Sequence, residues 1–119
     1  MSRLKDLETQ MDTLVEIEKM LSDNRVDEAL EFIKEKMDNA KSIISSKKEI
    51  AIFLNVLTKI KELLLSDKIG EAINFINEEI EGIGFAIDNE VEAMILQAEG
   101  DYENMMSEQP KESKMGEEV

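Results

Sequence analysis

Apolar residues recur along most of the chain at steps of three and four, the spacing that gathers side chains on one face of an α-helix. Little interrupts this pattern, because the chain has five glycines and a single proline, Pro110. The pattern therefore predicts an all-α protein with five helices.

The first three predicted helices cover about residues 2–21, 26–45 and 48–65. Asp23 and Asn24 are candidate N-caps for the second helix, because their short side chains accept hydrogen bonds from free backbone N–H groups. The third helix is apolar over most of its circumference, which predicts that it lies at the centre of the core.

The fourth predicted helix runs from about residue 69 to 87. Gly82 and Gly84 each cost about 1 kcal/mol relative to Ala in a helix, so we expect a bend or an end there. Asp88 or Asn89 is the candidate cap of a fifth helix. Four methionines fall on the apolar stripes of these helices and are predicted core residues: Met11, Met20, Met37 and Met94.

An internal repeat is visible when the chain is shifted by 43 residues, which aligns residues 7–37 with 50–80 without a gap. Eight of the 31 aligned pairs are identical. These pairs are Leu14 and Leu57, Ile17 and Ile60, Leu21 and Leu64, Glu28 and Glu71, Ala29 and Ala72, Phe32 and Phe75, Ile33 and Ile76, and Glu35 and Glu78. The shift predicts a duplicated helical hairpin; the alternative is two unrelated amphipathic hairpins with similar periodicity.

The predicted organisation is a single helical domain over residues 1–106. It consists of a first repeat at about 1–46, a second at about 47–88 and a capping helix at about 89–106. Residues 107–119 contain only two apolar residues, too few to offset the entropy of ordering them. We expect a disordered acidic tail.

Two segments, NRVDEALEFI at 24–33 and DKIGEAINFI at 67–76, resemble the turn and second-helix opening of a tetratricopeptide repeat, and GDYENMM at 100–106 is similar to its first part. The resemblance implies close helix contacts at the small residues Ala29 and Ala72. It also implies a set of larger side chains that fill the gap to the next helix: Phe32, Ile33, Phe75 and Ile76. A stack of such hairpins would present a groove to a partner.

The chain departs from the tetratricopeptide pattern in ways that affect the expected architecture. The period is 43 residues instead of about 34, and Ile17 and Ile60 replace the small residue of the first helix. Longer helices with bulky residues there could close into a compact bundle. The predicted fold is two tandem antiparallel helical hairpins plus a C-terminal capping helix, arranged either as a tetratricopeptide-like stack or as a compact five-helix bundle.

The side-chain chemistry offers no catalytic or cofactor site. The chain has no Cys and no His, so disulfides and the usual ligands of zinc, copper and haem are absent. The neighbouring acids Glu78 and Glu79, like Glu16 and Glu18, point in different directions on a helix and are typical of solvated faces. We expect a protein that is not an enzyme and needs no cofactor or metal.

The charge and hydropathy of the chain limit what it is expected to bind and where it is expected to be located. A net charge of −14 repels phosphate backbones and lipid headgroups, which argues against direct binding of nucleic acid or membranes. The most apolar stretch, residues 50–65, is too short and too polar to span a bilayer. The first ten residues mix acids and bases and precede no apolar run, which predicts a cytoplasmic protein.

These observations favour a protein–protein interaction module or a small adaptor subunit of a larger complex, with a partner that presents a basic surface. Two alternatives remain: an acidic mimic of nucleic acid that inhibits a DNA- or RNA-binding protein, and a homo-oligomeric scaffold such as a homodimer. Tyr102, Met105 and Met106 precede the tail without a full partner helix, so they are the candidate edge for a partner or for self-association.

Overall fold

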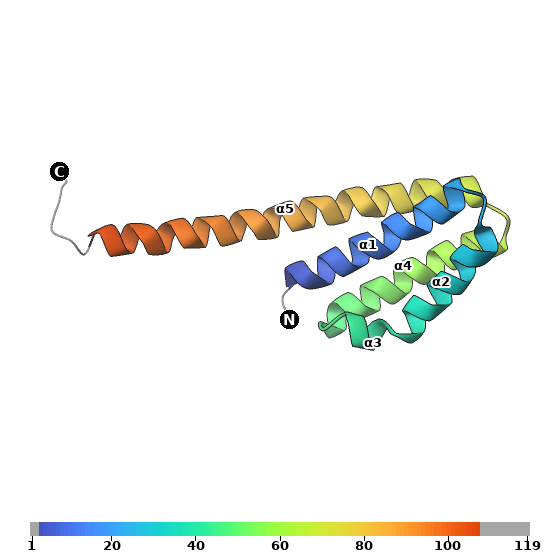
Figure 1. Ribbon diagram of the computed structural model, residues 1–119, viewed down its shortest axis with the longest axis horizontal. Coiled ribbons are helices and arrows are strands. Elements are labelled where there is room, and N and C mark those ends of the chain that lie inside the picture. The colour runs from blue at the N-terminus through green and yellow to red at the C-terminus, as the bar shows by residue number, and fades with distance from the viewer. Residues whose placement is uncertain (1–2, 108–119) are drawn as a thin grey trace. The chain divides into compact units, whose positions relative to one another are not determined.

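The computed structural model describes residues 3–107 of the chain, and their side chains as far as residue 98 (Figure 1). It contains helices α1 (Arg3–Ser22), α2 (Val26–Asp38), α3 (Ala40–Ile43), α4 (Lys47–Leu65) and α5 (Ile69–Ser107). The described residues contain no strand. The predicted all-α class is therefore confirmed. The chain divides into two units, the first ending at Ile87 and the second beginning at Asp88.

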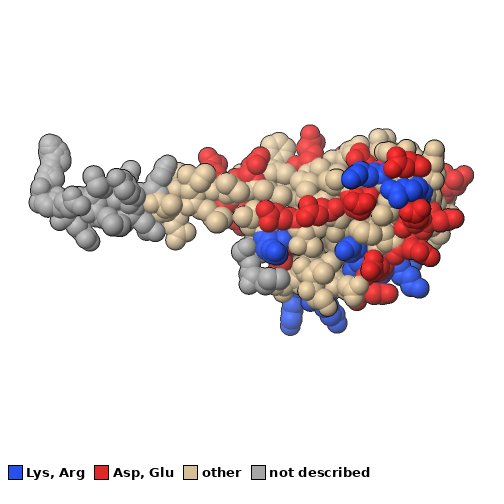
Figure 2. Space-filling model, viewed as in Figure 1, with Lys and Arg blue, Asp and Glu red and all other residues tan. Residues whose placement is uncertain are grey.

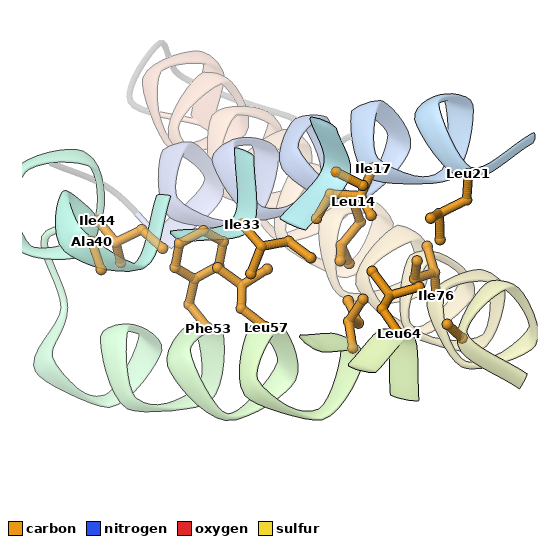
Figure 3. Packing of buried hydrophobic residues seen from close by; sticks show 13 residues of the cluster. Leu14, Ile17, Leu21, Ile33, Ala40, Ile44, Phe53, Leu57, Leu64 and Ile76 are labelled. Carbon is orange, nitrogen blue, oxygen red and sulfur yellow. The ribbon is translucent and has the colours of Figure 1, made fainter. Parts of the chain in front are cut away.

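The first unit is built around one hydrophobic core to which α1, α2, α3, α4 and the first turns of α5 contribute (Figure 3). Helix α2 packs against both α1 and α4. Thirteen buried apolar residues form this core: Leu14, Ile17, Leu21, Ala29, Ile33, Ala40, Ile44, Phe53, Leu57, Ile60, Leu64, Ala72 and Ile76. Ten of them form the five aligned pairs Leu14/Leu57, Ile17/Ile60, Leu21/Leu64, Ala29/Ala72 and Ile33/Ile76. The arrangement is a compact helical bundle.

The two hairpin turns have matching geometry at positions 43 residues apart. Asn24 and Asp67 both adopt φ of 60°, a left-handed conformation that Asn and Asp tolerate better than most residues. The next residue in each turn donates a 2.8 Å backbone hydrogen bond, from Arg25 to Met20 and from Lys68 to Leu63. These matches agree with the 43-residue shift, while the duplication itself stays a prediction.

The predicted second helix ends earlier than expected. Helix α2 stops at Asp38, and the short helix α3 follows Asn39 where a single helix to about residue 45 was predicted. The interruption turns the chain so that Ala40 and Ile44 are both buried in the core. Ile44 then adopts an extended conformation and leads to α4. Because burying Ile44 depends on the position of α4, the local apolar spacing did not predict this break.

The break predicted at Gly82 and Gly84 is absent, because α5 runs through both residues as one helix of 39 residues. The predicted fifth helix is consequently the C-terminal part of α5. Ile80 and Ile83 pack against the core beside these glycines, and their burial outweighs a helix-propensity cost of about 1 kcal/mol per glycine. A Cβ atom added at Gly84 would lie 3.8 Å from Met11 Cε, so this part of α5 lies against α1.

A buried polar cluster ties the start of α1 to the connection between α3 and α4. Asp6 is 1% exposed, and its carboxylate accepts hydrogen bonds from the backbone N–H of Ser45 at 3.0 Å and of Ser46 at 3.2 Å. The Ser45 hydroxyl donates to the same carboxylate at 3.0 Å. One turn along α1, Gln10 Nε2 donates to Glu49 Oε1 at 2.9 Å. This cluster aligns the beginnings of α1 and α4.

The hydrogen bonds around Asp6 also determine its ionisation. Burial raises the pKa of the Asp6 carboxyl, but the hydrogen bonds donated by Ser45 and Ser46 outweigh that effect and hold the pKa below its usual value. The group is therefore a carboxylate at neutral pH, and the folded state favours that form over the protonated one.

Candidate partner-binding surface

The C-terminal half of α5 exposes a row of large apolar side chains. Met94 is 57% exposed and Ile95 is 53% exposed, with Val91 at 39%. Together with the exposed Ala98, these residues occupy positions i, i+3, i+4 and i+7 of the helix, which are neighbours on one face. We call these four residues the α5 strip. The prediction that Met94 is a core residue is wrong, whereas Met11, Met20 and Met37 are half-buried.

The α5 strip continues a pattern that packs into the core in the first unit. Along α5, apolar residues recur at steps of three and four through Ile73, Ile76, Ile80, Ile83 and Ile87 and reach the strip at Val91. Ile76 is buried, and the other four are half-buried. The same spacing that predicts a buried helix face thus leads into an exposed one. The strip is therefore a candidate interaction site, since contiguous exposed apolar patches are rare on isolated proteins.

A second apolar set lies eleven residues further along α5: Tyr102, Met105 and Met106. It has the same spacing as Val91, Met94 and Ile95. Eleven residues make about three helical turns, so these positions return to nearly the same side of α5. The backbone there is helical, but the three side chains lie outside the described part of the structure. The predicted edge at Tyr102, Met105 and Met106 therefore stays a prediction, on the same line of α5 as the strip.

The charge of α5 is uniform in sign. From Ile69 to Ser107 it contains ten Asp and Glu residues and no Lys or Arg, so it carries ten of the 14 net negative charges. Helical spacing of about 100° per residue places Asp88 and Glu92 along one border of the α5 strip. The helices of the first unit differ, because acidic and basic side chains are interspersed on its visible face (Figure 2). A partner of the strip would therefore meet an apolar centre with an acidic border.

A second surface is a shallow groove between α1 and α2 whose floor contains Met20 and Phe32. It has two adjoining parts, of about 390 and 340 Å³. The lining adds five acids and one base: Asp12, Glu16, Glu28, Glu31, Glu35 and Lys36. Lys36 Nζ lies 5.2 Å from the centre of the Phe32 ring, a cation–π contact that covers part of the apolar floor. The groove is therefore less apolar than the α5 strip.

The residues implied by the tetratricopeptide resemblance lie in or beside the core of the first unit. Ala29, Ile33, Ala72 and Ile76 are all fully buried. Phe32 and Phe75 are half-buried and pack against the core. Their side chains support the arrangement of the helices.

Within residues 3–98, no group of three or more His, Cys, Asp or Glu side chains is placed to hold a metal ion. None of the helices in the described part of the chain combines the length and the apolar character needed to cross a membrane. Comparisons of this chain with protein-family models, with curated proteins and with solved structures found no match. Functional inference therefore depends on the surfaces themselves.

Proposed function

We propose that this protein is a non-catalytic interaction module, or a small subunit of a larger complex, that binds a protein partner through the α5 strip. The observation that carries the proposal is the exposure of Val91, Met94 and Ile95 on one helix face. Fully burying an exposed large aliphatic side chain contributes about 1.5–3 kcal/mol, so covering the exposed parts of these three side chains supplies a substantial part of a binding free energy. Loss of translational and rotational freedom offsets part of this gain.

The partner presents a basic surface around its own apolar contact. Ten acids without a base along α5 create a negative potential that accelerates encounter with a positively charged protein and disfavours acidic ones. The apolar strip then supplies most of the lasting attraction, because exposed ion pairs contribute less than about 1 kcal/mol each. Binding should therefore start faster at low salt but persist at high salt.

The strip also weighs against the two alternative functions. Pairing of two α5 helices in a homodimer would place acids beside acids, and like charges at helix contacts are unfavourable. A mimic of nucleic acid needs rows of carboxylates but no exposed Met94 or Ile95 between them. Photo-crosslinking should give a different product for each alternative and for the proposed function.

The test is photo-crosslinking in lysate of the cells that make the protein, with benzoylphenylalanine placed at Met94 of the full chain. The matched control carries it at Leu65, which is 65% exposed but is the last residue of α4 and not part of the strip. We expect one other protein to cross-link at position 94, to resist about 1 M salt and to be absent from the control. Equal products at both positions would overturn the proposal.

Two further outcomes would replace the proposal by an alternative. If only copies of this chain cross-link at position 94, the scaffold function is favoured. If nucleic-acid-binding proteins cross-link and are released at moderate salt, the mimic function is favoured, because attraction between exposed charges is screened.

A further inference from the structure

We infer that the partner contacts the α5 strip with a basic amphipathic α-helix. This inference rests on the proposed function and specifies the chemistry of the partner. The strip is narrow and runs along a helix axis: Val91 and Ala98 are two turns apart, and Met94 and Ile95 lie between them on either side. The other exposed large apolar residues of α5, Phe85 at 67% and Leu96 at 61%, lie on a different side of the helix at about 100° per residue. A flat surface would cover the strip only together with its acidic border, whereas a second helix brings an equally narrow apolar stripe.

The four residues have the arrangement that receives a side chain from a facing helix. In knobs-into-holes packing, one apolar side chain inserts among four residues of the opposite helix. Val91, Met94, Ile95 and Ala98 form such a set, with the small Ala98 leaving space at one corner. A partner helix with Leu or Ile at this position would fill it. The flexible side chain of Met94 can adapt to either Leu or Ile of the partner helix.

The acidic border of the strip specifies the charge of the partner helix. Asp88 and Glu92 occupy flanking positions, which in paired helices face flanking residues of the other helix and select opposite charges there. Because α5 offers no Lys or Arg from Ile69 to Ser107, every flanking ion pair needs its cation from the partner. Lys or Arg at the flanks of the partner's apolar stripe is therefore required.

No long helix of a second copy meets this requirement. Helices α1, α2 and α5 each contain more acids than bases. Helix α4 has more bases than acids, but its exposed large apolar residues, Ile52 and Leu65, are 13 residues apart and form no stripe. Its continuous apolar face, at Phe53, Leu57 and Ile60, is at most 1% exposed in the core. A second copy would have to unfold to present that face. The occupant is consequently a helix of another protein.

The experiment titrates the full chain with two synthetic amphipathic peptides that share the same Leu heptad positions. One peptide carries Lys at the flanking positions and the other carries Glu. We expect the Lys peptide to bind at least about tenfold more tightly at physiological salt. The double variant Asp88→Lys, Glu92→Lys should reduce or reverse this preference. Equal binding of both peptides to the unmodified chain would overturn the inference.

A second pair of variants separates the apolar contact from charge attraction. Met94→Gln combined with Ile95→Gln keeps the charge and the helix propensity of α5 while removing the apolar contact. We expect this variant to weaken binding of the Lys peptide by at least about 30-fold, as at the centre of other interfaces. Leu65→Gln, at an exposed apolar residue outside the strip, should leave the affinity unchanged. Unchanged affinity in the strip variant would overturn the inference.

The peptide titration and the crosslinking experiment fail independently. If position 94 cross-links a protein through a segment that is not a basic helix, the proposed function stands and this inference is wrong. If the Lys peptide binds as described but no cellular protein cross-links at position 94, the chemistry of the strip is supported and the proposed function is wrong.

Discussion

Replacement of Asp6 by Ala is expected to destabilise the protein at neutral pH. The carboxylate accepts hydrogen bonds from three donors: the backbone N–H groups of Ser45 and Ser46, and the Ser45 hydroxyl, which lies within reach of both carboxylate oxygens. Each contributes about 1 kcal/mol net, so their sum is about 3 kcal/mol. Ser45 is exposed and Ser46 is half-buried, so water partly replaces the carboxylate in the variant and returns about 1 kcal/mol. The expected loss in free energy of unfolding is therefore about 2 kcal/mol.

The loss should depend on pH in a defined direction. The pKa of Asp6 in the folded protein lies below its usual value of 3.8, because the hydrogen bonds from Ser45 and Ser46 outweigh the effect of burial. A lowered pKa means that the stabilisation is present above about pH 4 and disappears as the pH falls through the folded-state pKa. The difference between the natural chain and Asp6→Ala should thus be constant from pH 7 to 5 and shrink near pH 3.

Urea unfolding followed by circular dichroism at pH 7, 5 and 3 measures this difference. The matched control is Asp12→Ala, which removes an exposed carboxylate from the same helix and should change stability by less than about 0.5 kcal/mol. Asp6→Asn keeps one acceptor oxygen, so it should be intermediate and should lose the pH dependence. The reasoning is refuted if Asp6→Ala matches the control, or if its deficit is the same at pH 3 as at pH 7.

Three further substitutions test the helix packing and the turns by thermal or urea unfolding. Ala29→Leu should overpack the fully buried contact at α2 and cost about 1–3 kcal/mol, whereas Ala51→Leu on an exposed face of α4 should be neutral; equal stability of both would contradict the packing. Gly82→Ala should raise stability by about 0.5–1 kcal/mol, because no atom lies within 4 Å of the added Cβ; a loss would show an unsuspected contact. Asn24→Ala and Asp67→Ala should each lower the free energy of unfolding by about 1 kcal/mol, because each places an alanine at φ of 60°. Asn24→Gly should be tolerated, because glycine adopts this conformation readily. Similar effects of Ala and Gly would contradict this reasoning.

Short-range spacing was sufficient to predict most of the helical architecture. Apolar residues at steps of three and four located the helices and both hairpin turns, because helical periodicity is a local property of the chain. The 43-residue shift paired residues such as Leu14 with Leu57 and Ile17 with Ile60, and all four are buried. These features need no knowledge of which helix packs against which.

The apolar spacing of the chain could not predict the polar cluster at Asp6. Asp6 and Gln10 lie on the first turns of α1 and resemble solvated positions in the sequence, yet both are buried. Their partners Ser45 and Glu49 are 39 residues away along the chain. Only the packing of α1 against the start of α4 brings these groups within hydrogen-bond distance, so no local pattern could reveal them.

The sequence by itself determined that apolar residues recur at helical spacing from Ile73 to Ile95. Only the tertiary structure decided that they belong to one helix, and which part of its apolar face is covered. From Ile73 to Ile87 the first unit supplies helices that pack against the face, whereas Val91, Met94 and Ile95 stay exposed. Periodicity records how side chains are distributed around one helix. Burial depends on what lies opposite, and that is a property of the folded chain as a whole.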